Sequence, residues 1–340
     1  MKVLVTGGGG FLGSEICRQL LKRGDQVIAF QRGAAQELVK PGAVIIRGSI
    51  TDTNTLEQAI EGVDAVIHTA AKAGIWGPYD EYYQANVSGT ENVIGACLKY
   101  NISKLVFTSS PSVVHAGGDI EGGNESLPYP DEFGAAYPAT KALSEKRVMA
   151  ADSPALHTVS LRPHLIWGPG DNHLLPSLLA RAKSGKLRLP GPDKLIDTIY
   201  IRNAASAHVL ALDKLESAPE SVAGKTYFIS NDEPVSQREI IAGLLKAAGC
   251  EVEIQAISPR VAMAAGTVFE NVWKLLRLKS EPPVTHWSAN HLATAHWYDI
   301  SAAKRDFGYR VEVGIGEGLE ILKESFATSG AGPSYKNPQR

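Results

Sequence analysis

Short apolar runs alternate with helix-length amphipathic segments through the first half of the chain. The runs are rich in β-branched residues, as in KVLVT, QVIAF and DAVIHTA. The segments between them repeat apolar residues three to four positions apart, which is the period of a helix. Apolar strands that alternate with helices are typical of a parallel sheet covered on both faces. The pattern therefore predicts an α/β fold with a doubly wound parallel sheet.

The same pattern gives the expected elements and their grouping. The predicted strands are residues 2–6, 26–30, 43–48, 64–70, 104–110 and 157–163; the predicted helices follow the glycines to Gly24 and then cover 55–60, 81–100 and 138–151. After Leu165 the alternation weakens, while proline, glycine and tryptophan become frequent. We expect a main domain over residues 1–164, to which segments 197–212 and 225–230 return, a smaller and mainly substrate-binding region over 165–328, and a frayed tail over 329–340.

Composition and charge exclude several classes of protein. The net charge is −2, and no run of lysine and arginine suggests nucleic acid or an anionic membrane as a partner. Three widely spaced cysteines argue against a disulfide framework or a zinc cluster and fit a reducing compartment. The first apolar run is too short for a signal peptide, and no segment reaches eighteen uncharged apolar residues. We therefore expect a cytoplasmic protein without a transmembrane segment.

Four consecutive glycines follow the first strand. Gly7, Gly10 and Gly13 fit the pattern T-G-x-x-G-x-x-G between a strand and a helix, whereas Gly8 and Gly9 occupy its variable positions. Glycines at this spacing let the backbone approach a pyrophosphate, and the helix N-terminus offers it free N–H groups. The loop predicts a dinucleotide-binding site; the alternative is a tight turn in a flavodoxin-like protein that binds no nucleotide.

The end of the second strand bears on the choice of dinucleotide. A carboxylate there favours NAD, and a basic group accommodates the 2′-phosphate of NADP. This strand ends in Gln31 and Arg32, without a carboxylate. We therefore favour NADP(H), with Arg32 on the 2′-phosphate, and keep NAD(H) as the alternative cofactor. A solvated surface arginine is the alternative role for Arg32.

The segment YPATK combines two side chains that suit proton transfer. Tyr137 and Lys141 lie one helical turn apart, and Pro138 is tolerated in the first turn of a helix. A phenol needs a nearby cation to exchange protons at neutral pH. The segment TSSPS, at the carboxyl end of the strand before this helix, lies where open α/β sheets bind ligands. The alternative is an ordinary amphipathic helix face.

Taken together, these motifs resemble the extended short-chain dehydrogenase/reductase family over nearly the whole chain. The matching segments are TGGGGFLG, HTAA, NVSGTENV, TSSPSVV, YPATK and LRPHLIWGPGD. The resemblance implies a Rossmann-like fold that binds NAD(P). It makes Tyr137 the general acid, gives Lys141 the task of lowering the tyrosine pKa and holding the nicotinamide ribose, and places Ser110 on the substrate oxygen. Ser109 and Ser112 are alternatives to Ser110.

The resemblance also implies the residues that contact the cofactor. They are Gly7, Gly10, Phe11, Leu12, Gly13, Arg32, Ile50, Asp52, Ala70, Ala71, Tyr137, Lys141 and Pro163. Ser49 stands where the family often has an acidic residue for the adenine amine, and Asn86 is expected to brace the catalytic helix. The histidines at 68, 115, 164 and 173 are not at metal-ligand spacing, so we expect them in the core or lining the pocket and expect no metal.

Longer segments narrow the resemblance to the 3β-hydroxysteroid dehydrogenase-like branch and, within it, to bacterial reductases of 2-alkyl-3-oxoalkanoic acids. They are AAKAGIWGPYDEYYQANV, LIWGPGDNHLLP, YFISNDEP and HWYDISAAKRDFGY. The implied reaction is an NADPH-dependent reduction of a β-keto acid with two long alkyl chains, in olefin biosynthesis. Residues 259–278 form an amphipathic helix with a wide apolar surface. That surface suits acyl chains; it also suits a cap on the second domain's core or a membrane-surface helix.

Other functions stay open from the sequence. They are a steroid or isoprenoid alcohol dehydrogenase, a sugar-nucleotide epimerase or dehydratase, and an NADP-sensing regulator. Regulators on this fold usually lack the tyrosine, which this chain keeps at 137. By analogy with the family we expect a homodimer formed through helices 81–100 and 138–151, and association with other enzymes of the same pathway is a further expectation.

Overall fold

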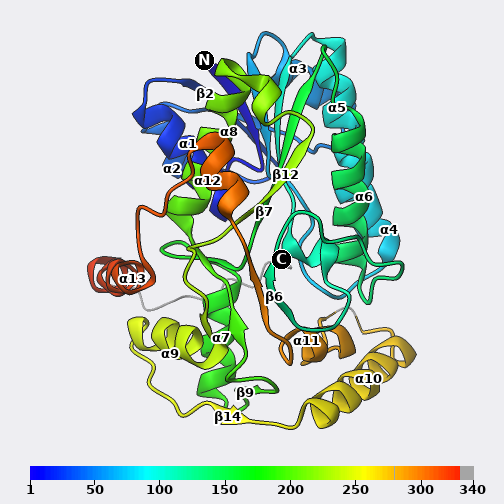
Figure 1. The fold of residues 1–340 in the computed structure, drawn as a ribbon, viewed down its shortest axis with the longest axis vertical. Coiled ribbons are helices and arrows are strands. Elements are labelled where there is room, and N and C mark those ends of the chain that lie inside the picture. Colours follow the sequence, from blue (N-terminus) through cyan, green and yellow to red (C-terminus); the bar gives the residue numbers. More distant parts are fainter. Residues whose placement is uncertain (279, 330–340) are drawn as a thin grey trace.

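Seven parallel strands form the centre of the molecule. The computed structural model describes residues 1–278 and 280–329 (Figure 1). Across the sheet the order is β12-β7-β5-β4-β1-β2-β3. The strands are β1 (Lys2–Thr6), β2 (Gln26–Gln31), β3 (Val44–Arg47), β4 (Ala65–His68), β5 (Lys104–Thr108), β7 (His157–Pro163) and β12 (Lys225–Ile229). The order reverses between β1 and β4, which is where doubly wound sheets bind ligands. The predicted Rossmann-like α/β fold is confirmed.

Helices cover both faces of this sheet. One face carries α1 (Phe11–Lys22) and α8 (Ile201–Ser217), and the other carries α3 (Thr53–Ile60), α5 (Gly89–Lys99) and α6 (Ala136–Ala150) (Figure 1). Successive residues of β1 point to opposite faces: Val3 and Val5 join the core under α1 and α8, and Leu4 joins the core under α3 and α5. Because both faces are buried, the strands are almost continuously apolar.

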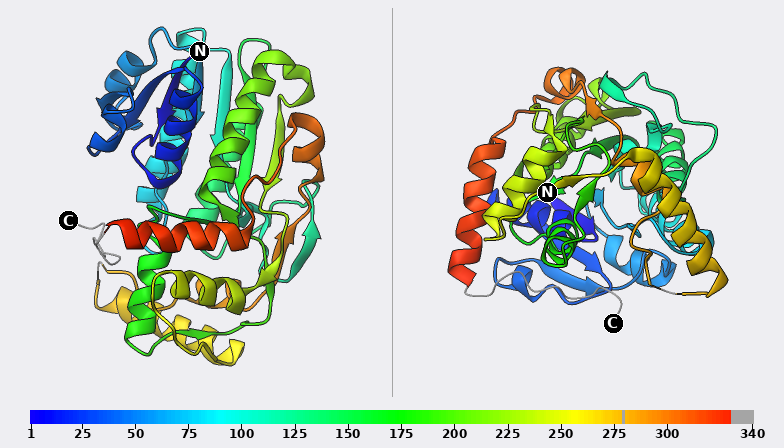
Figure 2. Two further views of the ribbon diagram at one scale, coloured as in Figure 1. Left: turned by 90° about the vertical axis from the view of Figure 1, so that its left-hand side faces the viewer. Right: turned by 90° about the horizontal axis from the view of Figure 1, so that it is seen from below.

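A second region continues from the carboxyl ends of these strands (Figures 1 and 2). Its four-stranded sheet has the order β13-β10-β15-β6. The short strands are β6 (Ile120–Gly123), β8 (Ile166–Trp167), β9 (Arg188–Leu189), β10 (Leu195–Ile196), β11 (Ile199–Tyr200), β13 (Val235–Ser236), β14 (Gln255–Ala256) and β15 (His296–Tyr298). The remaining helices are α2 (Gln36–Val39), α4 (Tyr79–Tyr82), α7 (Leu174–Lys183), α9 (Gln237–Ala247), α10 (Pro259–Leu275), α11 (His286–His291), α12 (Ser301–Phe307) and α13 (Ile315–Ser329), with 3-10 turns at Pro111–Val114 and Pro219–Ser221.

The two later segments that are predicted to return to the main domain, 197–212 and 225–230, reach it in different ways. Within 225–230, β12 pairs in parallel with β7 at the edge of the main sheet. The other segment, 197–212, adds no strand to that sheet, in which β12 occupies the edge position beside β7. Instead β11 pairs with β8 in a separate two-stranded sheet, and α8, which follows β11, packs on β5 and β7.

Three helical predictions are refined by the structure. The helix expected over 81–100 consists of α4, a π-helical turn at Tyr83–Ser88 and α5. α10 packs on α11 with Ala262 and Gly266 buried, whereas Val268 and Leu275 are 60% and 82% exposed, so the role of this helix stays a prediction. α13 extends to Ser329, and the rest of the tail predicted at 329–340 lies outside the described residues. Within the described part of the chain, none of the helices has the length and hydropathy needed to cross a membrane.

Candidate active site

In the glycine loop between β1 and α1, the surrounding backbone leaves no room for a side chain at Gly7 or Gly13. Gly7 has a φ of +71°, in the left-handed region that favours glycine. A Cβ on Gly7 would lie 2.9 Å from the backbone nitrogen of Ala70, and one on Gly13 would lie 2.2 Å from the Gly7 carbonyl oxygen. Gly10 is the N-cap residue of α1. Bare backbone therefore faces the N-terminus of α1, which is the geometry that accepts a dinucleotide pyrophosphate.

Packing also constrains one of the two glycines at variable positions. A Cβ on Gly8 would lie 2.7 Å from the Ala29 Cβ in β2, so the neighbouring strand requires glycine there. Gly9 meets only the flexible side-chain amide of Gln31. Packing therefore constrains Gly8 although the motif leaves its position variable, because the motif describes contacts with phosphate and carries no information about the strand beside the loop.

The end of β2 lies beside this loop. Gln31 is buried and donates from Nε2 to the Gly33 carbonyl oxygen at 3.3 Å, whereas Arg32 is exposed directly after the strand. An exposed guanidinium at this edge is compatible with a 2′-phosphate contact and with a solvated arginine. The role of Arg32 stays a prediction.

The other predicted cofactor residues lie along the carboxyl edge of the sheet. Asp52 is the N-cap of α3 and accepts from the backbone of Asn54 at 3.2 Å and of Thr55 at 3.4 Å; the Thr55 bonds, followed by that from Asn54, lower its pKa. Ile50 is buried against Gly89 of α5. Phe11 and Leu12 begin α1, Ala70 and Ala71 follow β4, and Pro163 is the last residue of β7. Their contacts with a cofactor stay predictions.

Lys141 of α6 reaches the carboxyl end of β5. Its Nζ donates to the carbonyl oxygen of Thr108 at 2.6 Å and lies 4.1 Å from the centre of the Phe107 ring. The side chain is buried, and burial lowers its pKa to about 7, although the charge of Glu145 acts in the opposite direction. A lysine with a pKa near 7 is therefore held at the end of a central strand.

Tyr137 lies one helical turn before Lys141 on α6 and is partly exposed. Burial raises the pKa of Tyr137, and a side-chain hydrogen bond with Ser110 lowers it. Ser110 caps the 3-10 turn after β5: its Oγ accepts from the Ser112 backbone at 3.2 Å and lies 2.9 Å from the Ser112 Oγ. Ser110 is the candidate serine whose hydroxyl lowers the Tyr137 pKa, and its role on the substrate oxygen stays a prediction.

A buried ion pair supports α6 and was missed at the sequence level. Arg162 of β7 donates to Glu145 of α6, with 2.6 Å from Nη2 to Oε1 and 3.0 Å from Nε to Oε2. Tyr129 and Ser160 donate to the same carboxylate at 2.6 and 2.9 Å. Burial favours the neutral acid, but the Arg162 bonds outweigh it and hold the pKa of Glu145 below its ordinary value. Because Glu145 follows Lys141 by four residues, their spacing on one helix face was the available signal.

Asn86 braces α6 as predicted. It lies in the π-helical turn before α5 and donates from Nδ2 to the Thr140 Oγ1 at 3.0 Å and to the Lys72 carbonyl oxygen at 3.1 Å. Its backbone carbonyl accepts from the Ser144 hydroxyl at 2.7 Å. These direct bonds fix the helix that carries Tyr137. π-Turns occur frequently at functional sites, and this one aims an amide at α6.

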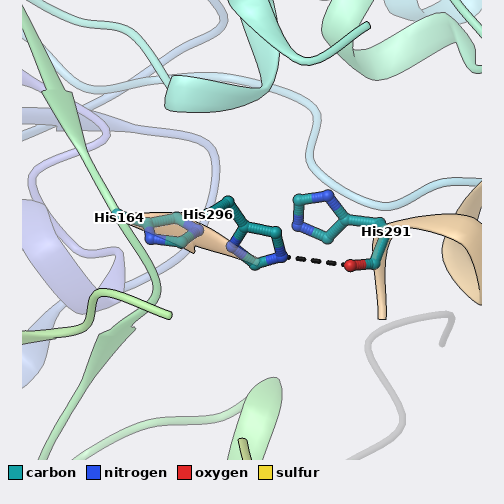
Figure 3. A group of neighbouring side chains, drawn as sticks. All are labelled: His164, His291 and His296. Atoms are coloured by element: carbon teal, nitrogen blue, oxygen red, sulfur yellow. Dashed lines mark hydrogen bonds between the residues drawn. The ribbon is translucent and has the colours of Figure 1, made fainter. Parts of the chain in front are cut away.

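Four histidines from distant segments gather at the same edge of the sheet. His115, His164 and His296 are buried and His291 is half-buried. His291 and His296 stack with ring centres 4.1 Å apart, and His164 meets His296 edge-on at 4.9 Å (Figure 3). The two histidines of this group considered from the sequence are buried, as expected. Their grouping was missed, because the four positions span 181 residues of chain and show no local spacing.

The other two histidines considered from the sequence lie elsewhere. His68 is buried in β4, with its ring nitrogens 2.6 Å from the Thr6 Oγ1 and 3.0 Å from the Thr90 Oγ1. Burial, with the Lys141 charge as a second cause, lowers the pKa of His68 to about 3. His173 is exposed before α7. His68 is therefore a satisfied core histidine.

Comparison with known proteins decides the family. The model of the 3-beta hydroxysteroid dehydrogenase/isomerase family matches residues 4–258. The 2-alkyl-3-oxoalkanoate reductase of Stenotrophomonas maltophilia is 52% identical over 96% of this chain and 100% of its own length; that of Shewanella oneidensis is 46% identical over 94% and 85%. The chain belongs to the 3-beta hydroxysteroid dehydrogenase/isomerase family. It is an NAD(P)-dependent oxidoreductase of the extended short-chain type, as predicted.

Solved structures agree with this assignment. The UDP-glucose 4-epimerase of Thermus thermophilus, solved in complex with NAD, has a TM-score of 0.73 and 25% identity over 96% of this chain and 99% of that one. The loop of this chain fits the same kind of cofactor, since protein atoms leave no room for a Cβ at Gly7 and Gly13 and the bare backbone lies at the N-terminus of α1. An NAD(P) cofactor is therefore supported.

Proposed function

We propose that this ketoreductase reduces a 2-alkyl-3-oxoalkanoic acid with long alkyl chains to the 2-alkyl-3-hydroxyalkanoic acid, with NADPH, in olefin biosynthesis. The observation that carries the proposal is the 52% identity to a 2-alkyl-3-oxoalkanoate reductase over that relative's whole length. The coupled Ser110 and Tyr137 beside a buried Lys141 supply the chemistry that the reaction needs.

In this proposal the side chains of the site manage one proton. The bound cofactor supplies a hydride to the ketone carbon. Tyr137 donates its phenolic proton to the ketone oxygen as negative charge develops there, and Ser110 donates a hydrogen bond to the same oxygen. Lys141, held by the Thr108 carbonyl, stabilises the resulting phenolate until solvent restores the proton. The product is the neutral hydroxyl group on C3.

One assay on the wild type tests the substrate class. NADPH absorbance is followed with a 2-alkyl-3-oxoalkanoic acid series, a 3β-hydroxysteroid with NADP, and UDP-glucose. We expect turnover of the keto acids, with kcat/KM rising with chain length, because each buried methylene contributes about 0.8 kcal/mol. Turnover of the steroid or the sugar nucleotide in place of the keto acids contradicts the proposal.

The preference for NADPH rests on Arg32 in this proposal. The variant Arg32→Ala is expected to raise the KM for NADPH at least tenfold and to leave that for NADH within twofold, because only NADPH carries the 2′-phosphate. Arg18→Ala, on the exposed side of α1, serves as the control and is expected to change neither constant. An unchanged NADPH to NADH ratio in Arg32→Ala removes Arg32 from this role.

A further inference from the structure

The four-histidine cluster, His115, His164, His291 and His296, contains buried polar atoms that the reaction as described leaves unused. Five ring nitrogens have no hydrogen-bond partner among the described residues: both nitrogens of His115 and the Nδ1 of the other three. A buried polar atom without a partner costs free energy, so such groups in native proteins almost always have one. Their concentration in one place indicates a ligand that supplies the partners.

The cluster adjoins the site on the side of Ser110. His115 follows the four-residue 3-10 turn that Ser110 caps, so only this short helical segment separates the two. His164 follows Pro163, the last residue of β7, at the same edge of the sheet. The next residue, Leu165, has a φ of +42°, a strained conformation for a branched side chain of the kind found at functional sites.

The cluster also adjoins the start of α6. The ring of His291 stacks on Trp287, with centres 5.0 Å apart. Trp287 in turn packs on Gly134, where a Cβ would lie 2.7 Å from the Trp287 Cδ1. Gly134 precedes Tyr137 by three residues. The cluster is therefore connected to the segment that holds Ser110 through His115 and to the segment that holds Tyr137 through Trp287.

We propose that the four-histidine cluster binds the carboxylate of the substrate, an inference that rests on the proposed reduction of a 3-oxo acid. In such an acid one carbon separates the carboxylate from the ketone, so the carboxylate must lie beside Ser110 and Tyr137. The buried cations nearby have other partners: Lys141 donates to Thr108, and Arg162 is paired with Glu145. Among the buried nitrogens without a partner in the described residues, five belong to these imidazoles, and the Nη1 of Arg162 is another.

The arrangement of the rings suits a carboxylate better than a metal ion. Candidate nitrogens of His164, His291 and His296 lie within 4.8 Å of one another. However, His291 and His296 are stacked within 8° of parallel, so their nitrogen lone pairs lie in two parallel planes, an arrangement that suits one tetrahedral ion poorly (Figure 3). A carboxylate has two oxygens, each of which accepts from a separate N–H.

The acidic groups around the cluster are already paired or hydrogen-bonded, so they do not compete for the imidazoles with an added anion. Asp119 faces it but is paired with Lys194 and accepts from the Ala295 backbone. Asp197 accepts from the Tyr298 backbone at 2.7 Å, and burial raises its pKa to about 7. Burial lowers the pKa of all four imidazoles, so the free cluster is neutral at pH 7. A nearby carboxylate favours the charged form of an imidazole and so acts against this lowering.

The test compares an acid with its neutral methyl ester. A 2-alkyl-3-hydroxyalkanoic acid and its ester are oxidised with NADP by the wild type, His164→Gln and His115→Gln. His157→Gln is the matched control: it also lies in β7 with an unpartnered Nδ1, but at the amino end of the strand. We expect each cluster variant to lower kcat/KM for the acid at least tenfold, mainly through KM, with kcat/KM for the ester within threefold of the wild type. The control should keep the wild-type ratio of acid to ester.

The outcomes separate this inference from the proposed function. Equal losses on acid and ester overturn the carboxylate site, and so does a stoichiometric zinc content that disappears in His164→Gln while the acid to ester ratio is unchanged. A wild type that oxidises neither compound but turns over a steroid or a sugar nucleotide overturns the proposed function itself. If the buried variants fail to bind NADPH, His291→Gln, at the half-exposed edge of the cluster, gives the same comparison.

Discussion

The Nζ of Lys141 lies 2.6 Å from the carbonyl oxygen of Thr108, so the end of β5 fixes a cation one helical turn from Tyr137. This bond links the central sheet to α6. On the same helix, Thr140 accepts from Asn86, and Glu145 is paired with Arg162 of β7. The tyrosine and the lysine therefore rest on a helix that is anchored at three points. Such anchoring limits the movement of the groups that handle the proton.

Tyr137→Phe is expected to lower kcat by a factor of about 10² to 10⁴, because it removes the proposed proton donor and little volume. The affinity for NADPH, measured by fluorescence titration, should stay within twofold of the wild type. Tyr100→Phe is the control. Tyr100 follows α5 and its hydroxyl lies 3.4 Å from Glu57, so this variant is expected to have near-normal activity. Near-normal activity in Tyr137→Phe would remove the tyrosine from the mechanism.

Lys141 makes stability depend on pH in a direction that follows from its pKa. Burial lowers this pKa from 10.5 to about 7, so between pH 7 and 10.5 the unfolded chain holds a proton that the folded chain has released. The Lys141 contribution to the free energy of unfolding therefore rises with pH over this window. We expect the stability of the wild type relative to Lys141→Met, measured by urea unfolding, to increase from pH 7 to pH 9.5. A constant difference would contradict the lowered pKa.

Because Glu145 and Arg162 form a buried ion pair, replacing the carboxylate by an amide is expected to lower the free energy of unfolding strongly. Glu145→Gln leaves a buried guanidinium without its counter-charge, which typically costs about 3–5 kcal/mol. Glu320→Gln breaks an exposed pair with Lys323 and should change the free energy of unfolding by less than about 1 kcal/mol. Chemical denaturation of both variants at pH 7 makes the comparison. Similar small losses in both would show that the buried pair is not needed for stability.

Gly13 gives a test of the glycine cradle. Gly13→Ala would place a Cβ 2.2 Å from the Gly7 carbonyl oxygen, so the loop must shift and the affinity for NADPH is expected to fall at least tenfold. Gly316→Ala is matched to it, since Gly316 also lies in the first turn of a helix but has no atom within 4 Å of an added Cβ. That variant should bind NADPH like the wild type. Unchanged affinity in Gly13→Ala would show that the loop does not hold the cofactor.

Features that depend on local sequence were predictable. The strands are short apolar runs, the glycine loop lies between a strand and a helix, and the four-residue spacing of Tyr137 and Lys141 places both on one helix face. Ser110 could be proposed because a strand end brings it to the ligand edge. Only the structure distinguishes Ser110 from Ser112 as the neighbour of Tyr137, because two hydroxyl groups two residues apart look equivalent in a sequence.

Features that depend on contacts between distant segments were not predictable. The four histidines come from the 3-10 turn after β5, the end of β7, α11 and β15, so only folding brings them together. The partner of Glu145 lies in a strand, and a helix pattern carries no information about it. Likewise, β11 is apolar enough for the main sheet, but the place beside β7 belongs to β12.

The transfer of one hydride to the keto acid tests the central claim most directly. Wild-type protein is incubated with a 2-alkyl-3-oxoalkanoic acid and NADPH that carries deuterium on C4 of the nicotinamide, with one stereoisomer of labelled cofactor in each reaction, and the product is analysed by mass spectrometry. The account predicts a 2-alkyl-3-hydroxyalkanoic acid with one deuterium on C3 from one of the two labelled cofactors, and an initial rate of its formation about 10² to 10⁴ times lower with Tyr137→Phe. Recovery of unreduced keto acid with the NADPH intact would contradict it.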